Sequence, residues 1–515
     1  MSTTPPVPSW CRVRRGAGNL LLVAPHGGAR CGEPPPGRDL KVNDLHTAAL
    51  AEELAAGLDA SLIANPLIDR NQLDLNRIAQ VTRHAPWFPA LLEELIAAIL
   101  ARHPRAEVLF LHGWNTTQAK CDIGVGHPLR DEADAALYAA VLTASPGYVA
   151  SRLARFRDAC AGRGIAALLG ERYPARHANN VLQLFRRHPG PAPPLAPRLR
   201  DWAVADRLEA VQLELGAPLR WPGPLRGDFA AALRESFAVA PVPGRSASGT
   251  RVGAVASSVP ATLQAYDPAA DVGVVARVDP AAAGARRAGR LLLFLGGTRV
   301  ALFTGEDAPG AAPRDGVRFM RRPDGLHLTF DGWALRTEDG SHYLDLELAL
   351  ARSHLLAVRA DLRFTRQRGD HGRARGTLTL DGNARAFDGV GFTPPVAPSG
   401  RDAPWRTPLS LHVGFDDTAV AVRHRVPGGT VVRDLGAAPR AASALAISFD
   451  GDPHAPGRIV VADSAGELVA TPIGRLAIVR SLAPGRRARV TFGVARVQRA
   501  GASGYGFYEY ARVLD

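Results

Sequence analysis

Two histidines stand where short apolar runs end. His26 follows "LLLVAP" and His112 follows "EVLFL", and a glycine comes directly after each of them. Neutral imidazole is the commonest ligand of zinc, and a catalytic zinc site usually takes three protein ligands and a water. A carboxylate would complete the set, and the candidates are Glu33, Asp39 and Asp44. The pattern indicates a site of metal-assisted hydrolysis, with glycines that let a backbone come close to a ligand.

Each of these residues also has an ordinary structural interpretation. A lone histidine after a strand is commonly a capping or packing residue. Asp44, in "KVNDLHTAALAEEL", is typical of a helix N-cap, and Asn43 could take the same place. At this point the role of Asp44 stays open between a metal ligand and a cap.

A polar segment follows, and it could hold an acidic substrate. "PLIDRNQLDLNR" places Arg70, Asp74, Asn76 and Arg77 within eight residues. A guanidinium binds a carboxylate through two parallel hydrogen bonds, so one or two arginines beside a metal would anchor a substrate that carries a carboxylate. A surface loop of ion pairs is the alternative.

Glu214, in "EAVQLELGAP", is the candidate general base. Neighbouring residues of a strand alternate between its faces, so Glu214 shares a face with Gln212 and not with Leu213 or Leu215. A carboxylate beside a metal could take a proton from the attacking water and pass it to the leaving nitrogen. A purely structural glutamate is the alternative.

The elements that must position these residues alternate up to about residue 239. Short apolar runs predict strands at 20–24, 61–64, 108–111, 165–169 and 210–215, and helical periodicity predicts helices at 45–58, 88–103, 131–142 and 147–160. Such alternation is typical of a mixed, mostly parallel sheet with helices on both faces. Ligands bind such sheets outside the carboxyl ends of the strands, where His26, His112 and Glu214 are expected.

The pattern changes at "APVPGRSASGT", which we interpret as a linker at residues 240–250. Beyond it, period-two alternation with Asp-Gly and Gly-Gly turns predicts a nearly all-β half. A Pro-rich break at residues 393–405 divides that half in two. The predicted organisation is an α/β domain at 1–239, a first β lobe at 251–395 and a second β lobe at 396–515.

Composition narrows the class of protein. The 515 residues are 46% hydrophobic, enough for large cores, and the net charge of +13 comes almost entirely from arginine without a dense basic run. We therefore expect no nucleic-acid partner. The four cysteines show no metal or disulfide spacing, and there is neither a signal-peptide pattern nor an apolar run of about 18 residues. We expect a cytoplasmic protein without a membrane span.

Taken in order, several motifs resemble the N-formylglutamate amidohydrolase family, which is related in fold to the zinc carboxypeptidases. They are "APHGG", "DLHTAALAEELAAGLDASLIA", "LDLNR", "LFLHG" and "AVQLEL", within residues 18–225. The resemblance implies a zinc-carboxypeptidase-like fold and a single Zn²⁺ held by His26, Asp44 and His112. It implies further that Asn76 and Arg77 hold the substrate's carboxylate, with Arg70 as a second clamp, and that the general base is Glu214.

The sequence departs from the family pattern at three places. Ala29 stands where the carboxypeptidases have a glutamate, so the second ligand rests on Asp44. Gly113 stands where the amidohydrolases usually have a serine. "ARHANNVLQLF" repeats the late motif with His177 and Gln183 but has Phe185 at its acidic position. The substrate therefore need not be formylglutamate.

The β half resembles the two-lobed lipocalin-like proteins related to carotenoid hydratases and tocopherol cyclases. The resemblance is carried by "TLTLDGNARAFDGVGF", "WRTPLSLHVGFDD" and "GYGFYEYARV". It implies a hydrophobic small molecule held between the lobes. Candidate lining residues are Trp333, Phe387, Phe392, Trp405, Tyr505, Phe507 and Tyr508, which could equally be core aromatics.

The sequence thus predicts a zinc-dependent amidohydrolase that cleaves an amide or ester bond in a small substrate carrying a carboxylate. The alternative is a protein that binds or converts a hydrophobic, isoprenoid-like small molecule through its β lobes, with a non-catalytic α/β domain. A third hypothesis makes the β lobes the catalyst. Convergence of His26, Asp44, His112 and Glu214 would favour the first.

Overall fold

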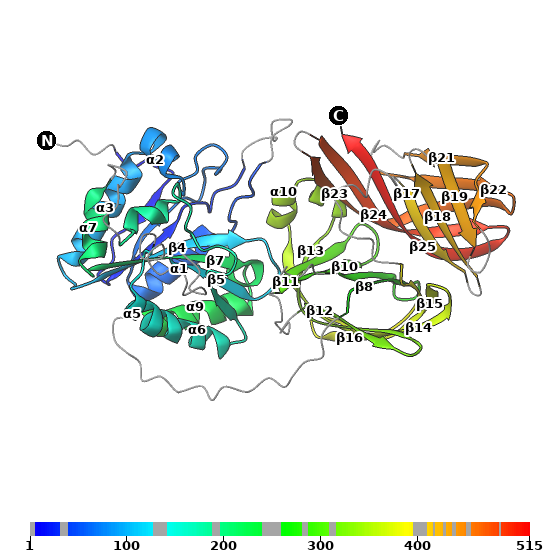
Figure 1. Ribbon diagram of the computed structural model, residues 1–515, viewed down its shortest axis with the longest axis horizontal. Coiled ribbons are helices and arrows are strands. Elements are labelled where there is room, and N and C mark those ends of the chain that lie inside the picture. Colours follow the sequence, from blue (N-terminus) through cyan, green and yellow to red (C-terminus); the bar gives the residue numbers. More distant parts are fainter. Residues whose placement is uncertain are drawn as a thin grey trace. The chain divides into compact units, whose positions relative to one another are not determined.

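The chain divides into two compact units, Met1–Arg251 and Val252–Asp515, each of which is described by itself (Figure 1). The computed structural model describes residues 6–30, 40–126, 142–187, 196–238, 259–280, 287–307, 316–394, 409–415, 418–425, 429–434, 439–449, 455–483 and 486–514. The predicted linker at 240–250 lies outside these residues, as do nearly all of the predicted helix at 131–142 and the residues Glu33, Asp39 and Trp405.

A seven-stranded sheet forms the centre of the first unit as far as it is described. Its order is β1-β3-β2-β4-β7-β5-β6. The strands are β1 (Arg12–Arg14), β2 (Leu20–Ala24), β3 (Ser61–Ala64), β4 (Ala106–Trp114), β5 (Lys120–Gly124), β6 (Ala166–Leu169) and β7 (Leu208–Gly216). The β1–β3 and β7–β5 pairs are antiparallel and the other four are parallel. The sheet is therefore mixed and mostly parallel, as predicted.

Helices cover both faces of this sheet (Figure 1). They are α1 (Thr47–Leu58), α2 (Ile78–His84), α3 (Trp87–Leu100), α5 (Pro146–Tyr148), η2 (Val149–Leu153), α6 (Ala154–Ala161), η3 (Val181–Phe185), α7 (Pro197–Val204), α8 (Ala217–Arg220) and α9 (Pro224–Phe237). Along β2, Leu20 and Leu22 enter the core with α1, α6 and α9, whereas Leu21 and Val23 enter the core with α2, α3 and α7. Burial on both faces explains the unbroken apolar run of this strand.

The predicted elements of this unit are largely present. The bounds of β2 and β3 agree with the prediction, β4 and β7 extend beyond it at both ends, and α1 begins two residues later than predicted. The predicted helix at 147–160 contains a π-helical stretch, η2. The antiparallel strands β1 and β5 escaped the prediction because β1 is only three residues long and β5 contains Lys120 and Asp122.

In its described residues, the second unit is built from two nine-stranded antiparallel sheets, which confirms the nearly all-β character predicted for this half. The first has the order β11-β10-β9-β8-β16-β15-β14-β13-β12, and β11 also pairs with β13, so the sheet curls back on itself. Its strands are β8 (Ala261–Asp267), β9 (Val272–Val278), β10 (Arg287–Phe294), β11 (Val300–Asp307), β12 (Gly316–Arg322), β13 (Gly325–Thr337), β14 (His354–Arg368), β15 (His371–Leu380) and β16 (Asn383–Phe392). The short helices η4 (Gly340–Leu344) and α10 (Leu346–Ala351) lie between β13 and β14 in the chain.

The second sheet of this unit has the order β20-β19-β18-β17-β25-β24-β23-β22-β21. Its strands are β17 (Leu409–Gly414), β18 (Ala419–Arg425), β19 (Gly429–Asp434), β20 (Arg440–Ala441), β21 (Ala444–Ser448), β22 (Arg458–Asp463), β23 (Gly466–Ala483), β24 (Arg486–Arg499) and β25 (Ala502–Leu514). Each sheet has its own apolar core, and a third cluster joins residues of both sheets.

Five of the seven aromatic residues proposed to line a ligand site lie in or against these cores, whereas Trp333 is half-buried outside them and Trp405 is not among the described residues. Phe387 belongs to the core of the first sheet and Tyr508 to the core of the second. Phe392, Phe507 and the half-buried Tyr505 belong to the cluster that both sheets share. Their packing fits the core interpretation of these residues. Within the described parts of the chain, no helix has the length and apolarity to cross a membrane.

Candidate metal centre

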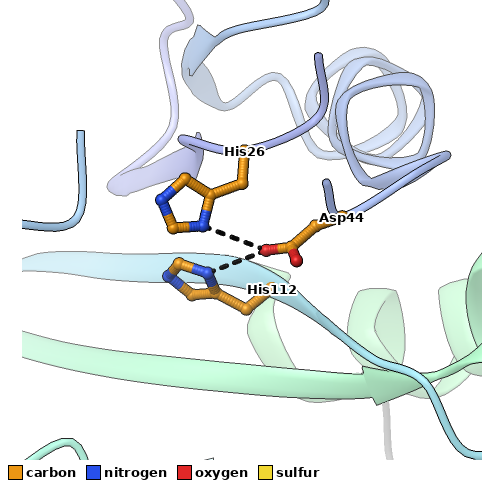
Figure 2. A group of neighbouring side chains, drawn as sticks. All are labelled: His26, Asp44 and His112. Atoms are coloured by element: carbon orange, nitrogen blue, oxygen red, sulfur yellow. Dashed lines mark hydrogen bonds and ion pairs between the residues drawn. The ribbon is translucent and has the colours of Figure 1, made fainter. Parts of the chain in front are cut away.

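Two imidazoles converge on one carboxylate oxygen in the first unit. Nδ1 of His26 lies 3.2 Å from Oδ2 of Asp44, and Nδ1 of His112 lies 3.0 Å from the same oxygen (Figure 2). The ring centroids of the two histidines are 4.9 Å apart. All three side chains are buried, with exposed fractions of 0% for His26 and 2% for the other two residues. The ligand atoms that they offer all lie within 4.8 Å of one another.

The parallel sheet produces this convergence. His26 follows β2 and His112 lies near the end of the neighbouring strand β4, which runs parallel to β2. Asp44 lies in the segment that leads into α1, and its backbone N–H donates to the carbonyl oxygen of His26 at 2.8 Å. The site therefore lies at the carboxyl ends of adjacent parallel strands, where ligands of open α/β sheets bind.

The capping interpretation of Asp44 is wrong. Helix α1 begins at Thr47, and its N-cap is His46, in the left-handed conformation without a side-chain capping bond. Oδ1 of Asp44 instead accepts a hydrogen bond from Nη1 of Arg70 at 3.1 Å. Asn43 does not cap the helix either, because its side chain bonds to Asp69 and to the backbone N–H of Arg70. The Asp44 carboxylate is thus directed at the two histidines.

Asp74 is a second carboxylate on His26, and the sequence reasoning gave it no role. Its Oδ1 lies 2.7 Å from Nε2 of His26 and accepts the backbone N–H of Asn76 at 3.0 Å. Its Oδ2 lies 3.0 Å from Nζ of Lys41 and 3.6 Å from Nε of Arg77. Metal-binding histidines commonly donate their second N–H to a carboxylate. The aspartate of "LDLNR" was therefore a candidate partner for His26 that the sequence already offered.

The surroundings of this cluster favour the ionised form of both carboxylates that contact His26. Burial opposes ionisation of Asp44, but Arg70 and the hydrogen bonds with His112 and His26 hold its pKa well below the usual range. Burial also opposes ionisation of Asp74, but His26, Arg70 and Lys41 lower its pKa. His26 lies between these two carboxylates, with Nδ1 3.2 Å from Oδ2 of Asp44 and Nε2 2.7 Å from Oδ1 of Asp74, so a proton or a metal ion can lie between Nδ1 and Asp44.

The residues present fit a metal ion. A tetrahedral zinc site with bonds near 2.0 Å has ligand-to-ligand distances of about 3.3 Å. The two nitrogen-to-oxygen distances of 3.2 and 3.0 Å are close to that value. Two imidazoles and one carboxylate are also a ligand set typical of catalytic zinc sites that keep a fourth position for water. His26, Asp44 and His112 could therefore hold the ion.

The three residues predicted to bind the substrate's carboxylate differ in the partners that they already contact. Arg70 binds Asp44, and its side chain is 17% exposed. Arg77, whose side chain is 32% exposed, lies against Asp74. Oδ1 of the buried Asn76 has no hydrogen-bond partner among the described residues. Both arginines contact buried acids of the His26 cluster rather than surface acids, so the surface ion-pair interpretation of this segment does not hold.

Glu214 lies beside His112 on the neighbouring strand. The two residues are register partners in the parallel β4–β7 pair. Oε1 of Glu214 accepts a hydrogen bond from Nε2 of Gln212 at 2.8 Å, which confirms that the two side chains share a face. Burial, and to a lesser degree the charge of Asp44, raises the pKa of Glu214 to about 7, against the opposing effect of His112. A carboxyl with this pKa can exchange a proton near neutral pH.

The glycines after the two histidines have a different role from the predicted one. A Cβ on Gly28 would lie 2.2 Å from the carbonyl oxygen of Ile68, and one on Gly27 would lie 2.5 Å from Cβ of Ala48. A Cβ on Gly113 would lie 2.7 Å from Cζ of Arg220. The chain itself, rather than a ligand, makes the close approach, so the expectation of a backbone open to a ligand is wrong.

Arg220 is a buried cation that the sequence reasoning missed. It is fully buried, and its guanidinium donates to the carbonyl oxygens of Leu45 and Leu215 and to Oδ1 of Asn115. Burial lowers its pKa to about 10, although Asp44 and Glu214 favour its charge. Its guanidinium leaves no room for a side chain at Gly113, where a Cβ would lie 2.7 Å from Cζ of Arg220. Only tertiary packing reveals this pairing.

The rival late motif does not join the site. His177 is exposed, and its Nδ1 accepts the backbone N–H of Asn179. Gln183 donates to the carbonyl oxygen of Ala175. Neither belongs to the group of residues placed to hold a metal.

Known structures match both halves of the chain at low similarity. No family model and no curated protein matches this chain. N-formylglutamate amidohydrolase from Ralstonia eutropha JMP134 has a TM-score of 0.30 and 14% identity, over 43% of this chain and 93% of its own. An AttH candidate from Nitrosomonas europaea has a TM-score of 0.27 and 15% identity, over 49% and 91%. Kievitone hydratase from Nectria haematococca has a TM-score of 0.25 and 9% identity, over 50% and 89%. Matches at TM-scores this low give no information about the chemistry of the site.

Glu214 should make the stability of the metal-free protein depend on pH. Its folded-state pKa of about 7 lies above the ordinary value of 4.5, so the folded state holds this proton more tightly than the unfolded state does. The resulting stabilisation is complete below the unfolded pKa and is lost as pH rises through 7. We expect the unfolding free energy of the parent, relative to Glu214→Gln, to fall by on the order of 3 kcal/mol between pH 4.5 and 8. Denaturant titrations with a chelator present measure it, and a pH-independent difference would contradict it.

Gly28 should not tolerate a side chain. Its Cβ would meet backbone atoms of Ile68, which cannot rotate away, so we expect Gly28→Ala to lower the unfolding free energy by about 1 to 3 kcal/mol. The matched control is Gly147→Ala in α5, because a Cβ there has open space around it. Chemical denaturation of both variants tests the difference, and equal stability would show that the loop around Ile68 yields.

Proposed function

We propose that the first unit is a zinc-dependent hydrolase that cleaves an amide or ester bond in a small substrate carrying a carboxylate. The observation that carries this proposal is the pair of imidazole Nδ1 atoms on one oxygen of Asp44, with Nε2 of His26 already occupied by Asp74. We assign the first unit to a zinc-carboxypeptidase-like class and the second to a lipocalin-like class as part of the same proposal.

His26, Asp44 and His112 would hold the ion. Bound there, Zn²⁺ supplies a Lewis acid that activates water and polarises the scissile carbonyl. Asp74 holds the ring of His26 and keeps its Nδ1 turned toward the centre. Arg70 holds the other oxygen of Asp44, so this carboxylate presents Oδ2 to the two histidines.

Glu214 is the proposed general base and acid. With a pKa of about 7, it is partly ionised at neutral pH, so it can accept the proton of the attacking water and return it to the leaving nitrogen. Gln212 holds Oε1 of this carboxylate and thereby sets its direction. Asn180 in turn donates to Oε1 of Gln212 at 3.0 Å, so the base is held by a chain of amides.

Arg77 is the proposed anchor for the substrate's carboxylate. Arg70 is committed to Asp44 at 3.1 Å, whereas the 3.6 Å contact of Arg77 with Asp74 is longer than a good hydrogen bond. A guanidinium so placed is available to form a bidentate pair with a ligand. Arg70 and Asn76, whose Oδ1 is unpartnered among the described residues, would support it from the same segment.

A hydrophobic ligand of the β lobes finds less support. A cavity of about 280 Å³ in the second unit is lined in part by the charged residues Asp271, Arg299, Arg336, Asp381 and Arg385. Such a lining suits a polar molecule better than an isoprenoid. Five of the seven aromatic residues proposed as lining lie in or against packed cores instead.

Metal binding should follow the proposed ligand set. We expect one equivalent of Zn²⁺ per chain, its loss in His112→Ala, and an affinity lowered about 10- to 100-fold in Asp74→Asn, which leaves the ligands in place but frees the ring of His26. Competition with a chromophoric chelator measures these affinities. His177→Ala is the control, because this exposed histidine lies outside the cluster. Parent-like zinc affinity in His112→Ala would overturn the ligand set.

Loss of the base should separate catalysis from metal binding. We expect Glu214→Gln to keep its zinc and its fold while turnover falls by about 10² to 10⁴, because the proton acceptor is lost and the ligands are not. Zinc-loaded parent and variant should be assayed on a panel of N-acyl amino acids that includes N-formylglutamate, beside the same amides with the carboxylate esterified. Hydrolysis of the esterified compounds at equal kcat/KM would refute the carboxylate anchor. Failure of the parent to cleave any of them would refute the proposal.

A further inference from the structure

A cavity of the first unit lies at the amino ends of the parallel strands, whereas His26 and His112 lie at their carboxyl ends. Its volume is about 730 Å³. Asn19 precedes β2, Arg105 and Glu107 lie at the start of β4, and Asp206 precedes β7, so the cavity opens at the amino ends of these parallel strands. Tyr148, Ser151, Arg152 and Arg155, from the helical segment α5–η2–α6, complete the wall.

The cavity wall contains a buried carboxylate, Glu107, whose oxygens are already bound by neighbouring side chains. Glu107 is only 3% exposed. Its Oε2 accepts a hydrogen bond from the hydroxyl of Tyr148 at 2.7 Å, and its Oε1 accepts from Arg152 at 2.9 Å and from Asn19 at 3.1 Å. Glu107, Tyr148, Arg152 and Asn19 are therefore a preorganised polar group within the wall, because Glu107 binds each of the other three.

Two guanidiniums on the cavity have no carboxylate partner among the described residues. Arg105 donates through Nε to the carbonyl oxygen of Asp206 at 3.0 Å, and Arg155 donates to the carbonyl oxygen of Ser236. Nε of Arg155 is buried without a partner within the described ranges. The carboxylate of Asp206 pairs with Arg187 instead. Since Arg152 balances Glu107, the charges of Arg105 and Arg155 are left for a ligand.

The backbone of the wall is unusual at the same place. Residues Val149–Leu153 form a π-helix, and two of them, Ser151 and Arg152, line the cavity. Single π-helical turns are rare within α-helices and are frequent at functional sites. The irregular turn coincides with the residues that face the cavity.

We propose that this cavity binds a small oxyanion ligand, which bears a carboxylate or a phosphate group, between Arg105 and Arg155. The site is separate from the candidate metal centre, and the proposal does not depend on hydrolysis. Arg105 and Arg155 supply the charge and the hydrogen-bond donors, whereas Glu107 is already bound by Tyr148, Arg152 and Asn19.

Calorimetric titration of the full chain in a chloride buffer tests this site, with inorganic phosphate and succinate as separate probes. We expect one of the two to bind, which also identifies the anion class. Arg105→Gln and Arg155→Gln should each weaken that binding at least about tenfold, because each removes a charge-assisted hydrogen bond. Arg83→Gln, which makes the same charge change at an exposed residue of α2, should bind like the parent. Binding should persist in Arg77→Gln, which separates this site from the proposed substrate anchor.

Two results would overturn the proposal. One is the absence of saturable binding of either probe below about 10 mM. The other is binding that neither Arg105→Gln nor Arg155→Gln weakens, or that Arg77→Gln abolishes. If Arg155→Gln fails to fold, Arg105→Glu at the exposed rim decides the matter, since reversal of this charge should abolish binding without disturbing the core.

Discussion

The first unit depends on one buried imidazole held between two carboxylates. His26 meets Asp44 on one side of its ring and Asp74 on the other, and all three side chains are removed from water. Buried carboxylates are costly unless they are paired. Lys41 and Arg77 lie against Asp74, and Arg70 holds Asp44, so basic side chains balance both acids. The oxygen of Asp44 that faces His26 is also the one that contacts His112.

The sheet makes this arrangement possible. Parallel strands end together, so residues from distant parts of the chain meet at one edge without needing long side chains. Helices on both faces exclude water from that edge, and the low local dielectric strengthens each interaction there. The same exclusion of water raises the pKa of Glu214 to about 7. The candidate ligand His112 on β4 therefore lies beside a carboxyl group on β7 that can carry a proton. Burial thus lies behind both halves of the proposed chemistry.

The charged side chains differ between the carboxyl ends and the amino ends of the strands in this sheet. At the carboxyl ends, Asp44 and Asp74 each direct an oxygen at His26, and Oδ2 of Asp44 is shared with His112. At the amino ends, Glu107 is neutralised by its neighbours, and Arg105 and Arg155 remain without a carboxylate among the described residues. The proposed cation at one end and the proposed anion at the other rest on the same rule, that a buried charge is stabilised by an opposite one.

By itself the sequence determined what depends on local pattern. The bounds of β2 and β3, the nearly all-β character of the second half and the placement of His26 and His112 at strand ends follow from apolar runs and periodicity over a few residues. Only the tertiary structure decided that Asp44 does not cap α1, that Asp74 holds His26 and that Arg220 packs on Gly113. These contacts join residues tens to more than a hundred positions apart, and no local pattern specifies which distant side chain will fill a buried space.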